Sequence, residues 1–208
     1  MKEYKVVFWD FDGVIKDSVD VKAQIFFELF LPLGEPIAVR VRQHHIANGG
    51  MSRFEKIPLY LQWAGLETSA ANIDRFCARF AQMVLPAVLA APWVPGAEFI
   101  LRGNPYCQTF IAVSATPQGQ LEEILGMLDL TSCFSKVYGA PTRKGDALHT
   151  VLIDRDFQPS ECLMIGDALE DLRAAEANKV PFLLRRHVSN TEIFSAYAGP
   201  SIEDFTGL

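Results

Sequence analysis

The chain has 208 residues, of which half are hydrophobic and about a fifth are charged, and its formal net charge is -6. This length allows one substantial core, or a core domain with a modest insert, and the composition excludes wholesale disorder. The negative charge argues against general nucleic-acid binding, which depends on many Lys and Arg residues at the phosphates.

The cysteine pattern and the start of the chain indicate a reducing, cytoplasmic setting. The four cysteines are scattered and form neither a C-x-x-C pair nor a zinc-ligand spacing. The first residues lead directly into a strand-like run with no signal-peptide core, and no apolar run reaches membrane-spanning length. We therefore expect reduced thiols and no membrane partner.

The first predicted element is a buried strand at residues 6–9, which ends in Asp10-Phe11-Asp12-Gly13. From residue 16 to 92 no run has the character of a buried strand, and apolar residues recur at helical spacing. Helices are expected there at 21–31, 37–47, 53–64 and 69–85. This stretch is therefore predicted to be a helical domain inserted after the first strand.

After residue 92, strand-like runs alternate with helical patterns. The strands are expected at 108–113, 136–138, 162–165 and 180–184, and the helices at 118–128, 145–155 and 169–178. Such alternation is typical of an α/β, doubly wound parallel sheet of Rossmann-like type. We predict a core domain from residues 1–15 and 93–208, with the helical insert over 16–92. The stretch 189–208 has only a weak helical pattern and then a loose tail, with no clear role.

Polar residues with chemical potential follow four of the predicted strands. They are Asp10 and Asp12, then Ser114, then Lys144 in the loop after the third strand, then Asp167. Ligands of doubly wound sheets bind at the carboxyl ends of the strands. We therefore expect these side chains to converge at one edge of the sheet.

The residues after the first strand suit the hydrolysis of a phosphate ester. Asp10 can act as a carboxylate nucleophile and give an acyl phosphate, which divides one difficult hydrolysis into two easier steps. Asp12 can protonate the leaving alcohol and later activate the attacking water. Gly13 allows a tight turn that brings backbone N–H groups to the phosphate.

The other polar residues suit Mg²⁺ and the phosphoryl oxygens. Mg²⁺ prefers hard oxygen ligands, for which we select Asp10, Asp167 and the main-chain carbonyl of Asp12. Asp171, four residues after Asp167, is expected to bind the metal through water or to orient Asp167 and Lys144. Lys144 would neutralise the aspartates and the phosphoryl group.

The second strand is expected to supply phosphate contacts. The Ser114 hydroxyl and the Ala115 N–H would bind a phosphoryl oxygen at the opening of the next helix, where the helix dipole favours an anion. Each of these motifs alone is more often an ordinary turn, cap or surface charge. Their occurrence in this order, each after a predicted strand, favours the functional interpretation.

These motifs resemble those of the haloacid dehalogenase superfamily, in its phosphatase and β-phosphoglucomutase-like branch with a helical C1-type cap. The resemblance rests on residues 7–18, 111–116, Lys144 and 164–171 and covers nearly the whole chain. It implies the same roles: Asp10 as nucleophile, Asp12 as acid and base, Ser114 and Lys144 as phosphate contacts, and Asp167 supported by Asp171 as metal ligand. It also implies that the insert, hereafter the cap, closes over the site.

Within the superfamily, hydrolysis of a small phosphate ester is the predicted activity. Dehalogenases lack the second aspartate, which is present here as Asp12. A phosphonatase with a Schiff-base lysine, Lys22 or Lys56, receives little weight because cap lysines are mostly solvated. A sugar phosphomutase remains an alternative, although Lys22 lies about where those mutases carry a histidine. A catalytically inactive relative that binds a metabolite is a second alternative.

The cap segment 44–53 is the most unusual polar stretch outside the motifs. Arg53 is the best candidate for holding a second anionic group, with Ser52 beside it. In the other interpretation, Gly49 or Gly50 ends one helix and Ser52 caps the next with Glu55. Both interpretations stay open, and a sugar phosphate or a phosphoglycolate-like acid fits the first.

Three further expectations complete the sequence analysis. The cap aromatics are expected to form the cap core, and Arg185-Arg186-His187 are expected to be a solvated turn. The cap aromatics in question are Phe26, Phe27, Phe30, Phe54 and Trp63. The oligomeric state, monomer or dimer, is not indicated by the sequence.

Overall fold

The computed structural model describes residues 1–207, and a six-stranded parallel sheet with the order β3-β2-β1-β4-β5-β6 forms its centre. The strands are β1 (Val6–Trp9), β2 (Thr109–Pro117), β3 (Lys136–Ala140), β4 (Cys162–Gly166), β5 (Phe182–Arg185) and β6 (Ser201–Ile202). The first strand of the chain pairs with β2 on one side and with β4 on the other. The residues that follow β1 therefore lie at the middle of the sheet edge.

Both faces of the sheet are buried, which explains the continuous apolar runs of its strands. Val7 and Trp9 of β1 belong to one core cluster, and Val6 and Phe8 belong to the other. The first cluster includes α5 (Ala97–Gly103) and α6 (Gln118–Met127), and the second includes α7 (Lys144–Asp154) and α8 (Leu169–Ala177). Helices thus cover both faces, and the predicted doubly wound α/β fold is confirmed.

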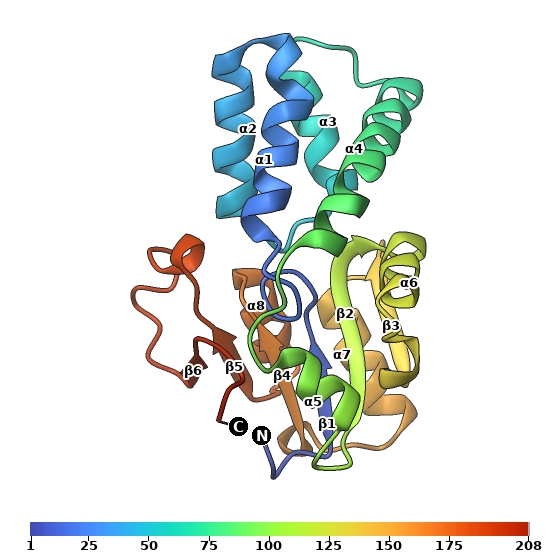
Figure 1. Ribbon diagram of the computed structural model, residues 1–208, viewed down its shortest axis with the longest axis vertical. Helices are drawn as coiled ribbons and strands as arrows, with labels where there is room; N and C mark the ends of the chain where they lie inside the picture. The colour runs from blue at the N-terminus through green and yellow to red at the C-terminus, as the bar shows by residue number, and fades with distance from the viewer. Residues whose placement is uncertain (208) are drawn as a thin grey trace.

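Four helices form the cap, which stands beyond one end of the sheet (Figure 1). They are α1 (Val19–Phe30), α2 (Glu35–Ala47), α3 (Arg53–Trp63) and α4 (Ala70–Ala90). Lys16 forms an antiparallel bridge with Trp93, so the chain leaves and re-enters the core through paired segments. The division at residues 16 and 92 stays a prediction.

Aromatic side chains fill the interior of the cap. Phe26 stacks on Phe80 with ring centroids 4.0 Å apart, and Tyr60 meets the edges of Phe26 and Phe30. The prediction that Phe54 belongs to this core is wrong, because its side chain is 45% exposed. Phe54 lies next to Arg53 on α3 but off the helix face that is buried.

The structure contains two short elements that the sequence did not indicate. Helix α5 has only seven residues, too few for a clear helical period. Strand β6 has two residues and pairs with β5 inside the stretch expected to be a tail. Residue 208, the end of that stretch, lies outside the described residues. Four 3₁₀ helices complete the description: Leu31–Leu33, Thr131–Cys133, Pro159–Glu161 and Val188–Asn190.

Among residues 1–207, no helix combines the length and the apolar character that a membrane crossing requires. All four cysteines are free thiols in this part of the chain.

Candidate active site

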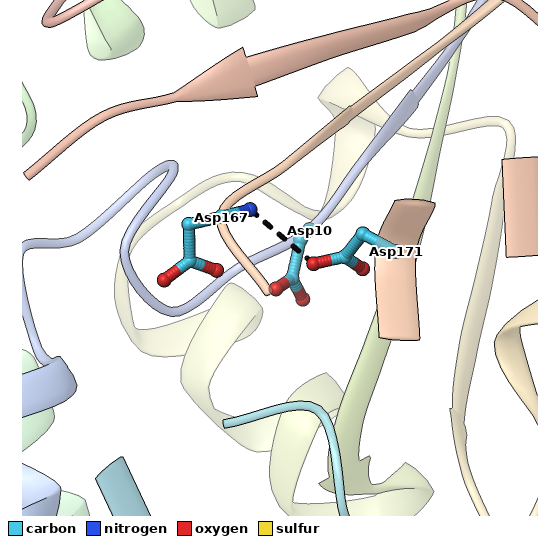
Figure 2. Close-up of side chains that lie close together, drawn as sticks. All are labelled: Asp10, Asp167 and Asp171. Atoms are coloured by element: carbon cyan, nitrogen blue, oxygen red, sulfur yellow. Dashed lines mark hydrogen bonds between the residues drawn. The ribbon is translucent and has the colours of Figure 1, made fainter. Parts of the chain in front are cut away.

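Three buried carboxylates meet at the carboxyl edge of the sheet (Figure 2). Asp10 follows β1, Asp167 follows β4, and Asp171 lies in the first turn of α8. One oxygen of each carboxylate lies within 4.8 Å of the others. This spacing is compatible with the prediction that one metal ion binds the carboxylates of both Asp10 and Asp167.

Lys144 is the cation that lies among these carboxylates. Its Nζ is 2.9 Å from Asp10 Oδ1 and also donates to Asp171 Oδ1. Lys144 is 4% exposed at the start of α7, so the ion pairs form away from bulk water. Burial alone would lower the pKa of Lys144, but Asp10 and Asp171 raise it well above its ordinary value.

The carboxylates share too little positive charge for all of them to ionise easily. Burial raises the pKa of Asp10 to about 7, with Lys144 opposing the shift and Asp171 and Asp12 adding to it. Burial also raises the pKa of Asp167 and of Asp171. A divalent cation would relieve this crowding, and a donor set of oxygens alone suits Mg²⁺. The residues present therefore fit the predicted metal.

The Asp171 carboxylate is held by backbone N–H groups and by Lys144. Its Oδ2 accepts hydrogen bonds from the backbone N–H groups of Ala168 (3.0 Å) and Asp167 (3.3 Å), while Oδ1 faces Lys144. Figure 2 shows this side chain directed at the loop that carries Asp167. Of the two predicted uses of Asp171, these contacts favour orientation of Asp167 and Lys144 over metal binding through water.

Position 13 requires glycine because the Asp167 carboxylate lies close to its backbone. Its φ is +76°, and a Cβ at this position would come within 2.2 Å of Asp167 Oδ2. A side chain here would therefore displace a carboxylate of the site as well as strain the backbone.

The Asp12 carboxylate points toward the cap and is held by three donors. Ser18 Oγ donates to Asp12 Oδ1 at 2.6 Å, Lys22 Nζ forms an ion pair with Oδ2, and Thr116 Oγ1 is 3.3 Å from Oδ2. Burial opposes ionisation, but Lys22 and the two hydroxyls lower the pKa of Asp12 below its ordinary value. Asp12 therefore ionises more readily than the neighbouring Asp10.

Lys22 is a site residue that sequence reasoning did not assign to Asp12. It lies on α1, and its Nζ also donates to Thr116 Oγ1 at 2.9 Å. Lys22 thus joins the cap to two segments of the core. The available signal was that Lys22 follows Ser18, the N-cap of α1, by four residues and so lies near the start of the helix that leaves the core.

Ser114 and Ala115 line the cavity above Asp10, but their local structure differs from the prediction. They were expected at the opening of a helix, whereas β2 runs on to Pro117 and α6 begins at Gln118. The pairing of β2 with β3 is irregular between Val113 and Pro117. Ser114 and Ala115 therefore lie in an irregular part of β2 and not at a helix N-terminus.

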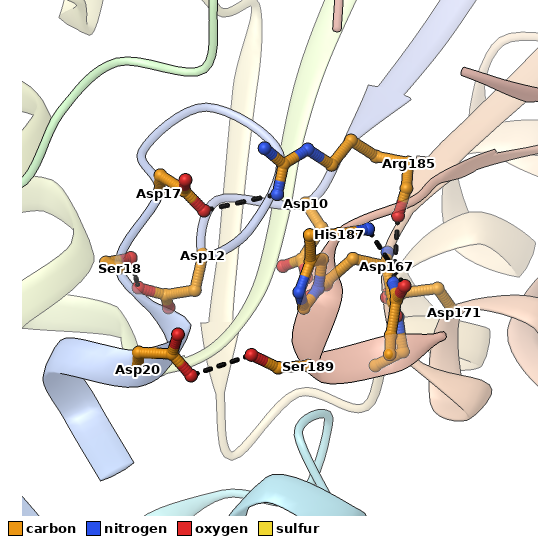
Figure 3. Close-up of polar contacts among 12 residues, drawn as sticks. Asp10, Asp12, Asp17, Ser18, Asp20, Asp167, Asp171, Arg185, His187 and Ser189 are labelled. Carbon is orange, nitrogen blue, oxygen red and sulfur yellow. Dashed lines mark hydrogen bonds and ion pairs between the residues drawn. The ribbon is translucent and has the colours of Figure 1, made fainter. Parts of the chain in front are cut away.

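The segment after β5 belongs to the site, so the prediction of a solvated turn is wrong. His187 Nε2 is 2.9 Å from Asp167 Oδ2, and the largely buried Arg185 pairs with Asp17 (Figure 3). Figure 3 also shows Ser189 bonded to Asp20 at the start of the cap. The sequence contained no periodic signal for these contacts, because they depend on where β5 ends in the sheet.

One cavity lies between the core and the cap. Its lining includes all five residues that were expected to converge: Asp10, Asp12, Ser114, Lys144 and Asp167. Arg53 of the cap lines the same cavity, whereas Ser52 lines a neighbouring one with Lys144 and Ala115. The first cavity has a volume of about 60 Å³.

The cap segment before α3 lies against the core. A Cβ at Gly50 would come within 2.4 Å of Glu170 Cβ, so only glycine fits this contact.

The predicted C-cap role of Gly49 or Gly50 is wrong, because α2 ends at Ala47 with Asn48 as its cap. Ser52 has the extended backbone of an N-cap, but its side chain makes no capping hydrogen bond within residues 1–207.

Comparison with known proteins identifies a family model, a haloacid dehalogenase-like hydrolase, that matches residues 4–178. No curated protein matches the chain significantly.

Several solved structures have the same fold. CbbY from Rhodobacter sphaeroides, in complex with xylulose-(1,5)bisphosphate, has a TM-score of 0.76 at 15% identity, covering 99% of this chain and 96% of that one. A predicted phosphoglycolate phosphatase from Haemophilus somnus 129pt has a TM-score of 0.74 at 16% identity, with coverage of 99% and 96%. YfnB from Bacillus subtilis, a HAD-hydrolase bound to magnesium, has a TM-score of 0.71 at 15% identity, with coverage of 97% and 95%. At these identities the likeness establishes the fold.

Proposed function

Because this chain belongs to the haloacid dehalogenase-like hydrolases, we propose that it is a Mg²⁺-dependent phosphatase that hydrolyses a small phosphomonoester through an aspartyl phosphate on Asp10. The observation that carries this proposal is that Asp10, Asp12, Lys144 and Asp167 all line one cavity. A nucleophile, an acid and base, and a cation thus face the same small volume.

In the first step, an Asp10 oxygen attacks phosphorus and the bond from phosphorus to the leaving alcohol breaks. Lys144 supports the ionised form of Asp10 through its 2.9 Å ion pair. Asp12 gives its proton to the departing oxygen. Asp12 must therefore be protonated beforehand, although Lys22 favours its anionic form. Displacement of Lys22 as the substrate enters would permit that protonation.

In the second step, Asp12 takes a proton from water and the oxygen of that water attacks phosphorus. The bond from phosphorus to Asp10 breaks, inorganic phosphate leaves, and the Asp10 carboxylate is restored. The ion pair of Asp12 with Lys22 favours the anionic base that this step requires. The same pair that hinders the first step therefore assists the second.

The phosphoryl oxygens would be held by Ser114 Oγ, the Ala115 N–H and Lys144. Asp10, Asp167 and the main-chain carbonyl of Asp12 would hold Mg²⁺, with Asp171 as the support that orients Asp167 and Lys144. Bound Mg²⁺ supplies positive charge at the phosphoryl oxygens. The cytoplasmic location and the monomeric or dimeric state stay proposals.

The cap would exclude water and select the substrate. Arg53 and Ser52 lie on the cap side of the two cavities and are proposed as substrate contacts. CbbY in its complex holds a sugar bisphosphate, and another neighbour is a predicted phosphoglycolate phosphatase. By analogy, we propose a sugar phosphate or a phosphorylated acid as the substrate class.

The test is phosphate release from a panel of phosphorylated sugars, acids and nucleotides, with Mg²⁺ and with EDTA, for the wild type and Asp10→Asn. Metal-dependent release that the variant lacks supports the proposal. Isomerisation of a sugar phosphate without release would favour the phosphomutase alternative. Binding without either reaction would favour an inactive metabolite-binding relative.

A further inference from the structure

The segment 185–190, which follows β5, brings a histidine to the side chain of Asp167. His187 Nε2 is 2.9 Å from Asp167 Oδ2, and the His187 side chain is 10% exposed. An ionised carboxylate can only accept hydrogen bonds, so Nε2 carries the hydrogen when Asp167 is ionised. The proposed reaction uses Asp167 as a metal ligand and leaves His187 without a role.

Asn190 fixes the main chain on both sides of this contact. It is 2% exposed, and its Nδ2 donates to the carbonyl oxygens of Asp167 and Arg185, each at 2.9 Å. Its Oδ1 accepts a hydrogen bond from the His187 N–H at 3.0 Å. The Asn190 amide therefore holds the backbone that carries the histidine against the backbone that carries the carboxylate.

The same segment is also attached to the chain that leads into the cap (Figure 3). The largely buried Arg185 places Nη1 at 3.2 Å from Asp17 Oδ1, and Ser189 Oγ donates to Asp20 Oδ1 at 2.7 Å. Contacts before and after His187 thus hold the segment in place. The position of the His187 ring is therefore set by several contacts of the protein, and not by Asp167 alone.

The two carboxylate oxygens of Asp167 have different surroundings. Oδ2 faces His187, and a Cβ on Gly13 would come within 2.2 Å of it, so the Gly13 backbone approaches this oxygen as well. Within residues 1–207 no hydrogen bond ends on Oδ1. Because Asp167 lines the cavity, Oδ1 is the oxygen that remains for a metal.

The number of oxygens that a carboxylate offers affects which divalent cation binds best. Mg²⁺ requires a nearly regular octahedron of ligands, whereas the larger Ca²⁺ accepts irregular sites and often takes both oxygens of one carboxylate. A site that restricts a carboxylate to one oxygen therefore favours Mg²⁺. Loss of a group that orients a metal ligand typically changes metal affinity by about 10- to 100-fold.

We propose that His187 is a positioning residue that keeps Oδ2 of Asp167 engaged, so that this carboxylate offers the metal one oxygen and the site favours Mg²⁺ over Ca²⁺. This inference rests on the proposed function, because it concerns the metal of the same site. His187 acts through Asp167, and Asn190 supports it through the backbone.

The experiment measures the dissociation constants of Mg²⁺ and Ca²⁺ by calorimetry without substrate and compares their ratio, Kd for Ca²⁺ divided by Kd for Mg²⁺. His187→Ala, which frees Oδ2, should lower this ratio by at least about tenfold, chiefly through weaker Mg²⁺ binding. A purely structural role would weaken both cations alike and leave the ratio unchanged. A ratio that falls by less than about threefold would overturn the proposal.

Two further variants assign the effect to the donor of His187. His187→Gln retains an N–H donor and should keep the ratio within about threefold of the wild type. Val188→Ala changes a neighbouring side chain that is 93% exposed, and as the matched control it should also keep the ratio. His187→Leu retains more side-chain volume and replaces His187→Ala if that variant does not fold. An equal fall of the ratio in Val188→Ala would refute the assignment to His187.

Because binding is measured without substrate, this inference and the proposed reaction can fail separately. If the wild type binds Mg²⁺ but releases no phosphate from any compound, the phosphatase proposal fails and the ratio still tests His187. If the wild type is a Mg²⁺-dependent phosphatase and His187→Ala keeps the wild-type ratio, only the role of His187 is refuted. A wild type that binds no Mg²⁺ would overturn the metal site and the role of His187 together.

Discussion

Two sides of the active-site cavity balance their charges in different ways. We call them the core wall (Asp10, Asp12, Lys22, Lys144 and Asp167) and the cap wall (His45, Arg53, Lys56 and Gln120). On the core wall each lysine lies beside a carboxylate: Lys144 beside Asp10, and Lys22 beside Asp12. On the cap wall Lys56 meets a neutral histidine and Arg53 meets an amide. The core wall therefore balances its lysines with carboxylates of the protein, whereas the two cations of the cap wall have neutral partners.

The largest effect should come from removal of the nucleophile on the core wall. Asp10→Asn should reduce turnover by at least about ten-thousandfold, because an amide cannot form the acyl phosphate. The fold should persist, since Lys144 keeps Asp171 as a partner and one of three crowded carboxylates is gone. Phosphate release and thermal melting check both parts, with Asp146→Asn at an exposed position as control. Residual turnover close to the wild-type rate would assign the chemistry to another group.

Removal of the metal should have the next largest effect. EDTA should reduce turnover by about a thousandfold, because Lys144 alone then balances the charge of the three carboxylates. Mg²⁺ should also raise the melting temperature of the wild type, and Asp167→Asn should weaken that shift. A melting temperature that does not respond to Mg²⁺ in the wild type would contradict the metal assignment.

The contact of Lys22, on cap helix α1, with Asp12 joins the cap to the core and should have the next largest effect. Lys22→Met should lower kcat by about tenfold near pH 6, because loss of the cation raises the pKa of Asp12. Asp12 then stays protonated to a higher pH and cannot act as the base, so the acid limb of the pH–rate profile should move upward. Lys22→Arg should largely restore the limb. An acid limb that does not move in Lys22→Met would exclude this role.

The difference between the walls also explains what the sequence could predict. Asp10, Lys144 and Asp167 follow strands and Ser114 lies in the last part of β2, and the parallel sheet brings strand ends to one edge. Their convergence therefore follows from chain order alone. The same reasoning predicted the sheet and most helices within a few residues.

The cap wall and the contacts after β5 could not be predicted in this way. Helical spacing indicates that a face of α3 is buried, but not that a lysine and an arginine lie on that face. The position of Lys56 beside His45 depends on how α2 and α3 pack, which no local pattern encodes. His187 likewise reaches Asp167 because β5 lies next to β4.

The smallest predicted effect concerns stability, and it measures the cost of the cap wall directly. Lys56→Met should raise the free energy of unfolding by roughly 2–4 kcal/mol at pH 6, because a buried cation without a carboxylate is replaced by an apolar side chain of similar size. Arg42→Met, at an exposed position, should change it by less than about 0.5 kcal/mol.

The gain from Lys56→Met should decrease with rising pH. Below about pH 7 Lys56 is protonated in both the folded and the unfolded chain, so its burial cost is present in full. Between about 7 and the ordinary pKa of 10.5, the folded chain holds fewer protons at Lys56 than the unfolded chain, and the wild type becomes more stable as the pH rises. The groups around Lys56 that set this window are His45, Lys22, Asp12 and Glu55. Urea unfolding at pH 6 and pH 9 should therefore give a larger gain at pH 6. An equal gain at both values would mean that Lys56 keeps its proton throughout, and a loss of stability would mean that it already has an anionic partner.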